Sequence, residues 1–469
     1  MPIAARLIAA AALAMPAALA NADEVDDAIT RVMGEHVKPG EPGCTVGVTK
    51  DGSLTHALAF GLADLERSKP LDARSVFNLA SVSKQFTAFA ILLLEQDGKL
   101  KVDDPVVKYL PELGNSAQGV TLAHLMHHTG GLRDYIEVLY MKGRSDADGT
   151  TINEAVEILA RQTAPNEAPG VEFDYSNTGY FLLGVVVARV SGESLAEFSR
   201  RRIFEPLGMK NTSIIDRYPA PIPALARGYA RKDGGFRIDE TGWEQVGDGQ
   251  VHSDLHDLAL WDENFYTGQV GGKALVGRMY DVGLLNSGES TGYAAGLSVR
   301  ESRGLRWVTH SGSWVGYRSS IERLPDQHLS VIVLCNRAEA EASAYADEVA
   351  EILLGDRLGP REPEEEEPEP EPEPVAAQWD PGDLARFAGA YYSPEADVRC
   401  VLDQRGARLV LEGCARGAAL RPGKPGEFVT ADGYPALRFA AAGKDAGSFI
   451  YWSPGLRGLP FKRIEEKFE

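Results

Sequence analysis

The sequence predicts an α/β (α+β) main domain, in which an antiparallel sheet is flanked by helices and carries a helical subdomain, followed by a small all-β barrel-like domain. Strand-like apolar segments lie near both ends of the first 358 residues, and helical patterns dominate between them. This order is expected when one sheet is built from both ends of a domain and a helical block is inserted beside it. Further on, short segments punctuated by Gly and Pro are typical of an all-β domain.

The elements of the main domain follow from apolar periodicity and turn residues. Residues 44–48 and 54–60 form a predicted hairpin that turns at Lys50-Asp51-Gly52. Residues 86–94 are apolar nearly all round, as in a helix enclosed on every side, and a second such helix covers 180–190. The remaining predicted elements are strands at 292–299, 307–310, 319–324 and 329–334 and a closing helix at 338–354.

A change of composition separates the two domains. Residues 361–374 contain eight glutamates interspersed with prolines, which predicts an extended spacer inside a linker at 359–379. The predicted division is a signal peptide at 1–22, the main domain at 23–358, this linker, and a C-terminal domain at 380–469. Strands of the C-terminal domain are expected at 400–402, 408–411, 427–430, 437–439 and 449–452.

The N-terminus predicts export. An apolar run over residues 7–20 follows Arg6 and ends in small residues around Ala20 and Ala22, as in a cleaved signal peptide. The run is shorter than the roughly 20 apolar residues of a spanning helix. We therefore expect a bacterial periplasmic or secreted protein with no membrane span in the mature chain. The formal net charge of −20 argues against nucleic acid as a partner.

Four cysteines lie beyond the signal peptide: Cys44, Cys335, Cys400 and Cys414. In an exported chain they permit two disulfides, for which three pairings exist. We favour Cys400 with Cys414, which would close a short loop. Cys44 and Cys335 are either a second pair or two small buried hydrophobic residues.

The first chemical motif is Ser81-x-x-Lys84, directly before the apolar helix at 86–94. Residues three apart on a helix are neighbours, so the Lys84 amine can reach the Ser81 hydroxyl and serve as its base. If the helix begins near Ser81, its free N–H groups and dipole also favour an anion there. The same spacing arises by chance when a serine only caps a helix, so partner motifs must decide.

Two partner motifs are present. Tyr175-Ser176-Asn177 precedes the helix at 180–190, where a tyrosine can relay protons and an asparagine amide can orient a lysine or a substrate carbonyl. These residues also make an ordinary helix-starting turn. His310-Ser311-Gly312-Ser313 ends a predicted strand, whose edge can bind an extended substrate closely because of the glycine.

Taken together, Ser81-x-x-Lys84, Tyr175-x-Asn177 and His310-x-Gly312 occur in the order seen in class C serine β-lactamases, D,D-peptidases and related esterases. The chain resembles this superfamily over residues 23–354. The segments 121–132, 205–209 and 325–336 are also similar to sequences of its members. The resemblance implies a β-lactamase-like fold and an acyl-enzyme mechanism.

By this resemblance, Ser81 is the catalytic nucleophile, Lys84 is its base, and Tyr175 shares the proton transfer. The resemblance also assigns substrate binding to Asn177, His310, Gly312 and Ser313. It further implies that the backbone N–H groups of Ser81 and Ser313 form the oxyanion hole.

One departure from the family pattern concerns the substrate. Many relatives have Lys-Thr-Gly where this chain has His310-Ser311-Gly312, and the lysine there pairs with a substrate carboxylate. Imidazole is largely neutral at pH 7, which argues against strong β-lactamase or carboxypeptidase activity. Histidine here, with a C-terminal domain that resembles lipocalin-like domains, is similar to D-aminopeptidases and esterase-like relatives.

The predicted function is an exported serine hydrolase that forms acyl-Ser81 from an amide or ester, in a D-amino-acid-containing peptide or a small ester. The alternatives are a true β-lactamase, a carboxylesterase, or a non-catalytic peptidoglycan-binding protein of the same fold. The expected partner is a small-molecule or peptide substrate, with peptidoglycan fragments among the candidates.

No cofactor and no metal are expected. Two histidine groups have helical spacings that can bind zinc, namely His124, His127 and His128, and His252 with His256. However, no H-E-x-x-H sequence is present. The first group also falls within the stretch of family resemblance, where packing and hydrogen bonding explain it.

Overall fold

The computed structural model describes residues 22–360, 381–406, 408–414, 418–440 and 446–465. The predicted signal peptide and linker fall almost entirely outside these residues and stay predictions. Within the described part of the chain, no helix combines the length and apolar character required to cross a bilayer.

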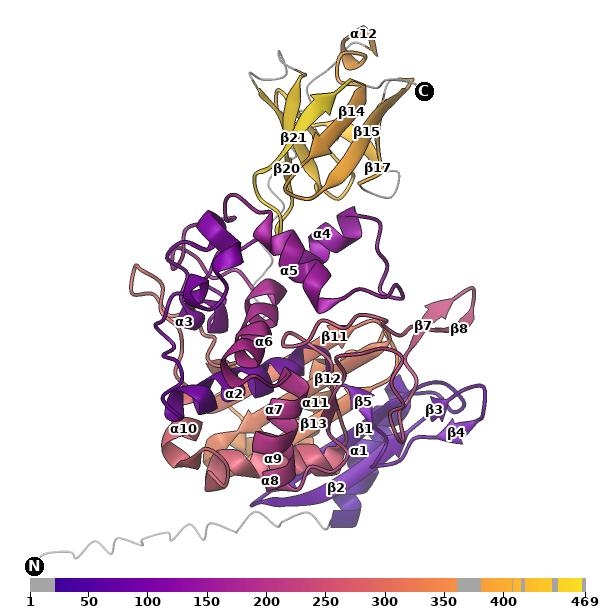
Figure 1. Ribbon diagram of the computed structural model, residues 1–469. Helices are drawn as coiled ribbons and strands as arrows, with labels where there is room; N and C mark the ends of the chain where they lie inside the picture. Colours follow the sequence, from indigo (N-terminus) through magenta and orange to yellow (C-terminus); the bar gives the residue numbers. More distant parts are fainter. Residues whose placement is uncertain (1–21, 361–380, 407, 415–417, 441–445, 466–469) are drawn as a thin grey trace, which may run out of the picture.

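The main sheet is built from both ends of the domain, as predicted (Figure 1). β1 pairs with β13 in antiparallel register, so that an early strand lies beside the last one. The strands run in the order β10-β11-β12-β13-β1-β2, and all neighbours are antiparallel. Their bounds are β1 (Cys44–Lys50), β2 (Ser53–Phe60), β10 (Ser298–Ser302), β11 (Leu305–Trp314), β12 (Tyr317–Leu324) and β13 (Leu329–Cys335).

The strand predicted at 292–299 is largely wrong, because β10 begins only at Ser298. Gly292 and Gly296 both have positive φ, at 67° and 73°. Left-handed backbone turns the chain and cannot continue an extended strand. The edge strand is therefore short, and it pairs with β11 only as far as Thr309.

Helices cover both faces of the sheet. α1 (Ala22–His36) and α11 (Ala342–Leu354) pack on one face, over a core of side chains from β1, β12 and β13. On the other face lie α9 (Leu255–Thr267) and the 3-10 turn η1 (Ala80–Ser83). α11 begins four residues later than predicted.

The apolar segment after Ser81 becomes α2 (Lys84–Gln96), whose residues 84–94 are all buried. α2 packs against α6 (Asn177–Ser191), the second predicted apolar helix. The helical block also contains α3 (Leu122–Met126), α4 (Tyr135–Met141), α5 (Ile152–Ala160), α7 (Leu195–Ser199), α8 (Glu205–Leu207) and α10 (Gly272–Arg278).

Short strands lie before and within this block, and the sequence did not predict them because two to four residues show little periodicity. The most relevant is the small sheet of β5 (Phe77–Asn78), β9 (Val251–Ser253) and β6 (Ser213–Ile214). It ties the segment before Ser81 to the chain around residue 250. The others are β3 (Leu62–Asp64) with β4 (Lys69–Pro70), and β7 (Tyr229–Lys232) with β8 (Gly235–Ile238).

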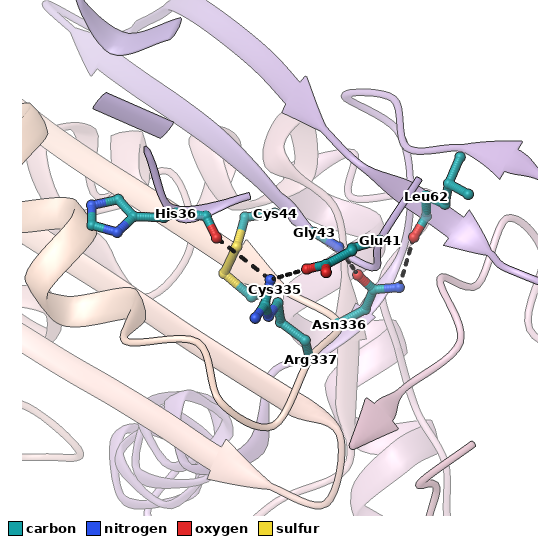
Figure 2. The surroundings of a disulfide bond; sticks show 8 residues. All are labelled: His36, Glu41, Gly43, Cys44, Leu62, Cys335, Asn336 and Arg337. Carbon is teal, nitrogen blue, oxygen red and sulfur yellow. Dashed lines mark hydrogen bonds and ion pairs between the residues drawn. A yellow bond between two sulfur atoms is a disulfide. The ribbon is translucent and has the colours of Figure 1, made fainter. Parts of the chain in front are cut away.

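Both disulfides considered from the sequence are present, Cys44–Cys335 and Cys400–Cys414. The first joins β1 to β13 across a sequence separation of 291 residues. Figure 2 shows that neighbouring polar contacts secure the same seam. Asn336 accepts a hydrogen bond from Gly43 N at 2.8 Å and donates one to Leu62 O at 3.1 Å.

The C-terminal part forms a closed eight-stranded barrel, which confirms the predicted all-β domain. Aromatic side chains, Phe387 and Phe428 among them, fill its interior. β14, β17 and β21 were not expected from the sequence. The helix α12 (Pro381–Leu384) precedes the strands β14 (Gly389–Ser393), β15 (Val398–Arg405), β16 (Arg408–Glu412), β17 (Ala418–Pro422), β18 (Glu427–Val429), β19 (Ala436–Phe439), β20 (Ser448–Trp452) and β21 (Leu459–Ile464).

The barrel docks on the helical block near α4 and α5 (Figure 1). Arg133, 3% exposed, donates to Glu395 Oε2 at 2.5 Å, so this ion pair is buried between the two parts. The loop between β20 and β21 adds a second contact, in which Gly455 N donates to Glu137 Oε1 at 3.0 Å. Arg457 N donates to Asn166 Oδ1 at 2.7 Å in the same loop.

Candidate active site

Ser81 lies in the 3-10 turn η1, which runs directly into α2 at Lys84, so helical backbone begins near Ser81. The turn is entered through Ala80, whose φ of +47° is unfavourable for a residue with a Cβ. Asn78 Oδ1 accepts the Ala80 N–H at 2.8 Å, and Asn78 Nδ2 donates to Gln250 Oε1 at 2.9 Å. Strained backbone of this kind persists only where the surroundings hold it.

Lys84 is fully buried, and three acceptors surround its amine. Nζ donates to Ser81 Oγ at 3.0 Å, to Asn177 Oδ1 at 2.9 Å and to the Asp248 carbonyl oxygen at 2.9 Å. Two of these acceptors are predicted site residues: Ser81 is 3 positions from Lys84 in the sequence, and Asn177 is 93 positions away. The structure thus brings Ser81, Lys84 and Asn177 together.

Tyr175 stands at the entrance of the same site, 42% exposed. Lys84 Nζ lies 4.9 Å from the centroid of its ring. The Tyr175 ring also packs on His128, with ring centroids 4.2 Å apart. His128 also binds the backbone of the Tyr175-Ser176-Asn177 motif, because Ser176 N donates to His128 Nδ1 at 3.0 Å.

His310 is buried beside Tyr293, a residue the sequence did not single out. Tyr293 Oη and His310 Nε2 are 2.8 Å apart, and His310 Nδ1 lies 2.6 Å from the Ser311 carbonyl oxygen. Burial, and secondarily the nearby Lys84 charge, lowers the pKa of His310 to about 4. The imidazole is therefore neutral at pH 7, as expected for this motif.

Gly312 lies where the third motif crosses the turn that carries Ser81. A Cβ at this position would lie 2.2 Å from the Leu79 carbonyl oxygen, so only glycine fits. Ser319 Oγ on the next strand donates to the same oxygen at 2.7 Å. Because β10 stops pairing at Thr309, residues 310–314 form a free edge of β11 beside Ser81.

A cavity of about 700 Å³ opens at this edge. Lys84 and Gly312 lie behind its wall, whereas the other predicted site residues line it directly. These lining residues are Ser81, Tyr175, Asn177, His310 and Ser313. No described residue of the barrel lines it.

Sequence reasoning missed an acidic side chain in this cavity, Asp248. Its Oδ2 accepts a hydrogen bond from Tyr135 Oη at 2.7 Å, but its Oδ1 is buried and finds no hydrogen-bond partner among the residues that the structure describes. Burial raises the pKa of this carboxyl group, although the Lys84 charge opposes the shift. Asp248 lies between two glycines in an irregular segment, so no periodic pattern indicated it.

The histidine groups do not converge on one point. His124 Nδ1 accepts from Thr121 N at 3.2 Å as part of a helix cap, and His127 Nδ1 donates to Tyr293 O at 3.2 Å. His252 Nδ1 donates to Gln250 O at 3.1 Å. Among the described residues, no group of three or more His, Cys, Asp or Glu is placed to hold a metal ion.

Comparisons with known proteins agree with this fold. The sequence model of the family named Beta-lactamase matches residues 25–355. Penicillin-binding protein 4* of Bacillus subtilis is 34% identical over 316 residues, which cover 63% of this chain and 68% of that protein. A D-aminopeptidase of Cereibacter sphaeroides is 28% identical over 324 residues. The match covers 69% of this chain and 61% of the D-aminopeptidase, so it spans less than two thirds of that relative's length.

A solved structure extends the similarity across both domains. The octameric penicillin-binding protein homologue from Pyrococcus abyssi superposes with a TM-score of 0.62 at 24% identity, over 95% of this chain and 96% of that chain. These matches confirm the superfamily resemblance and the enzyme class inferred from the motifs. The chain belongs to the Beta-lactamase family of serine hydrolases.

Proposed function

We propose that this enzyme cleaves an amide or ester through an acyl intermediate on Ser81, with Lys84 as the base. The observation that carries the proposal is the position of the Lys84 amine. Asn177 and the Asp248 carbonyl hold Nζ within 3.0 Å of Ser81 Oγ. An activated nucleophile requires a base that is itself oriented by further groups.

The chemistry follows from this geometry. In the reacting form the Lys84 amine is neutral, so it donates to Asn177 Oδ1 and the Asp248 carbonyl oxygen and accepts the hydrogen bond of the Ser81 hydroxyl. Ser81 Oγ bonds to the substrate carbonyl carbon as its proton passes to the lone pair of Lys84 Nζ, and the carbonyl oxygen becomes an oxyanion. The N–H groups of Ser81 and Ser313 would bind that oxyanion, with each such donor typically worth ~2.7–4 kcal/mol. The bond to the leaving group then breaks, and the leaving group takes the proton from Lys84 by way of Tyr175. Water adds to the acyl carbon, and Ser81 is released with its proton restored.

Two features support a substrate with a free amine and no essential carboxylate. Neutral His310 provides no fixed positive charge for a carboxylate. Asp248 lines the cavity and its buried Oδ1 has no hydrogen-bond donor among the described residues, whereas buried acceptors of this kind are normally satisfied. A D-amino acid amide or short peptide with a free N-terminus meets both conditions, in line with the D-aminopeptidase relative. The amine would approach Asp248 while the carbonyl lies at Ser81.

Export belongs to the same proposal. The two disulfides, Cys44–Cys335 and Cys400–Cys414, are typical of an oxidising compartment such as the periplasm. They support the interpretation of residues 1–22 as a signal peptide, and peptidoglycan fragments are then accessible substrates.

The decisive experiment compares three chromogenic substrates, a D-alanine anilide, a cephalosporin and a short-chain ester, on the purified mature protein. We expect Ser81-dependent turnover, with the D-alanine anilide preferred. Ser81→Ala should lose turnover and labelling by a serine-directed phosphonate, while the exposed Ser53→Ala serves as the control. Turnover of the anilide that persists in Ser81→Ala would refute the mechanism.

A further inference from the structure

The cavity at Ser81 does not end at the catalytic groups. Successive side chains of β11 point to opposite faces of the sheet. Trp307 packs in the core beneath α11 and Val308 in the core of the other face. By this alternation Thr309 points to the α11 face, and His310 points to the face that carries the Ser81 turn. The same cavity is lined by Ser81 and by Glu322, Ser343 and Asp347, which belong to the α11 side. It therefore passes around the free edge of β11 and reaches both faces.

The far part of the cavity is acidic. Glu322 on β12 is only 4% exposed, and its Oε1 accepts a hydrogen bond from Ser320 Oγ at 2.8 Å. Asp347 on α11 lines the same space. We call the region formed by Glu322, Asp347, Ser320 and Ser343 the acidic compartment.

One oxygen of the acidic compartment lacks a donor. Glu322 Oε2 is buried and has no hydrogen-bond partner within the described part of the chain, and Arg300 Nη2 lies 3.9 Å from it. The Arg300 side chain is 47% exposed and lies at the rim. Burial, and next the Asp347 charge, raise the pKa of Glu322 to about 7. Such a carboxyl group is stabilised when a cationic donor comes within hydrogen-bond distance.

We propose that the acidic compartment binds a primary ammonium group on the substrate, at the end of an arm that runs from the scissile carbonyl across the β11 edge. This inference rests on the proposed function, because it assumes that the scissile carbonyl lies at Ser81. It names a substrate class, namely amides or esters that carry a distal ammonium. Arg300 would favour a carboxylate instead, but the two carboxyl groups outnumber it inside the compartment.

The test uses D-alanyl amides of linear amines, H-D-Ala-NH-(CH2)n-X, with n from 2 to 5 and X an ammonium, a hydroxyl or a carboxylate. Chromatography follows the release of the amine. At the best n, we expect wild-type kcat/KM for the ammonium compound to exceed that for the hydroxyl compound by about 10- to 100-fold, the value of a charge-assisted hydrogen bond. Glu322→Gln should reduce this ratio to within about threefold of unity.

Matched variants show whether the ammonium preference depends on Glu322 or on any nearby negative charge. Glu301→Gln removes an exposed carboxylate on neighbouring β10 and should keep the wild-type ratio. Asp347→Asn should lower the ratio less than Glu322→Gln does, and it tests the compartment if Glu322→Gln does not fold. A wild-type ratio near one, a preference for the carboxylate, or equal ratios in Glu322→Gln and Glu301→Gln would overturn the proposal.

A binding measurement distinguishes this proposal from failure of the proposed function. Calorimetric titration of Ser81→Ala with the ammonium and hydroxyl compounds reports affinity without turnover. Tighter binding of the ammonium compound, lost when Glu322→Gln is added, supports the acidic compartment even if no compound is hydrolysed. Equal binding of both compounds, with Ser81-dependent hydrolysis intact, refutes the compartment and leaves the proposed function standing.

Discussion

Tyr293 Oη donates to His310 Nε2 at 2.8 Å, while His310 Nδ1 lies 2.6 Å from the Ser311 carbonyl oxygen. Because a carbonyl only accepts, Nδ1 carries the proton and Nε2 is the acceptor, an assignment that follows from the hydrogen-bond partners. With its pKa near 4, His310 is a neutral, oriented ring at the edge of β11. At neutral pH this position therefore gives the site polarity without charge.

Replacement of this neutral ring by a cation tests its role in specificity. His310→Lys should raise kcat/KM for a carboxylate-bearing substrate over its neutral isostere by about 10-fold, because a charge-assisted pair replaces a neutral contact. Steady-state kinetics with the paired substrates measures this ratio. His256→Lys on α9, away from the cavity, is the control, and an unchanged ratio in His310→Lys would show that the position does not select charge.

The proposed role of Lys84 can be tested while the proposed nucleophile, Ser81, stays in place. Lys84→Met keeps an unbranched side chain but leaves Ser81, Asn177 and the Asp248 carbonyl without their shared donor. We expect kcat to fall by about 10³-fold or more while circular dichroism shows a folded protein. The exposed Lys99→Met should retain wild-type kcat. A Lys84→Met enzyme within tenfold of wild type would identify another group as the base.

Glu322 should make stability depend on pH. The folded pKa, about 7, is above the ordinary value of 4.5, so between these pH values the folded state keeps a proton that the unfolded state has lost. Its stabilising contribution is complete below about pH 4.5 and is lost as pH rises through about 7. Relative to Glu322→Gln, the free energy of unfolding of the wild type should fall by ~3 kcal/mol between pH 4 and pH 8.

Denaturant unfolding at several pH values measures this difference. Glu301→Gln is again the matched control and should differ from the wild type by a nearly constant amount. A Glu322→Gln curve parallel to that of the wild type would contradict the raised pKa.

The contact between barrel and helical block offers a comparison of two ion pairs. Arg133 and Glu395 are buried, whereas Arg161 and Asp397 are paired at 3.0 Å on the surface. Arg133→Met leaves a buried carboxylate unpaired and should destabilise docking by ~3–5 kcal/mol. Arg161→Met should cost less than ~1 kcal/mol. Thermal unfolding and limited proteolysis report both changes, and equal effects of the two variants would show that burial does not govern this interface.

Much of the candidate active site could be located from the sequence because its motifs are local. Ser81 and Lys84 are three residues apart on continuous helical backbone, a spacing that makes them neighbours, and Asn177 and the Asp248 carbonyl then orient the Lys84 amine. The sheet could likewise be predicted from apolar strands at the two ends of the domain. Local patterns failed where glycines with positive φ turn the chain at 292–297, and where strands in the helical block are too short for periodicity.

By itself, then, the sequence determined the family, the order of the strands along the chain and the three motifs of the site. Only the tertiary structure decided which distant groups meet them: Tyr293 at His310, Asp248 at Lys84, and Glu322 across the edge of β11. The physical reason is that hydrogen-bond satisfaction and burial depend on neighbours that are not adjacent in the sequence, 17 residues away for Tyr293 and His310 and 164 for Asp248 and Lys84. No sequence pattern distinguishes such a carboxyl group from others. It becomes a candidate ligand site only when the fold buries one of its oxygens away from any hydrogen-bond donor.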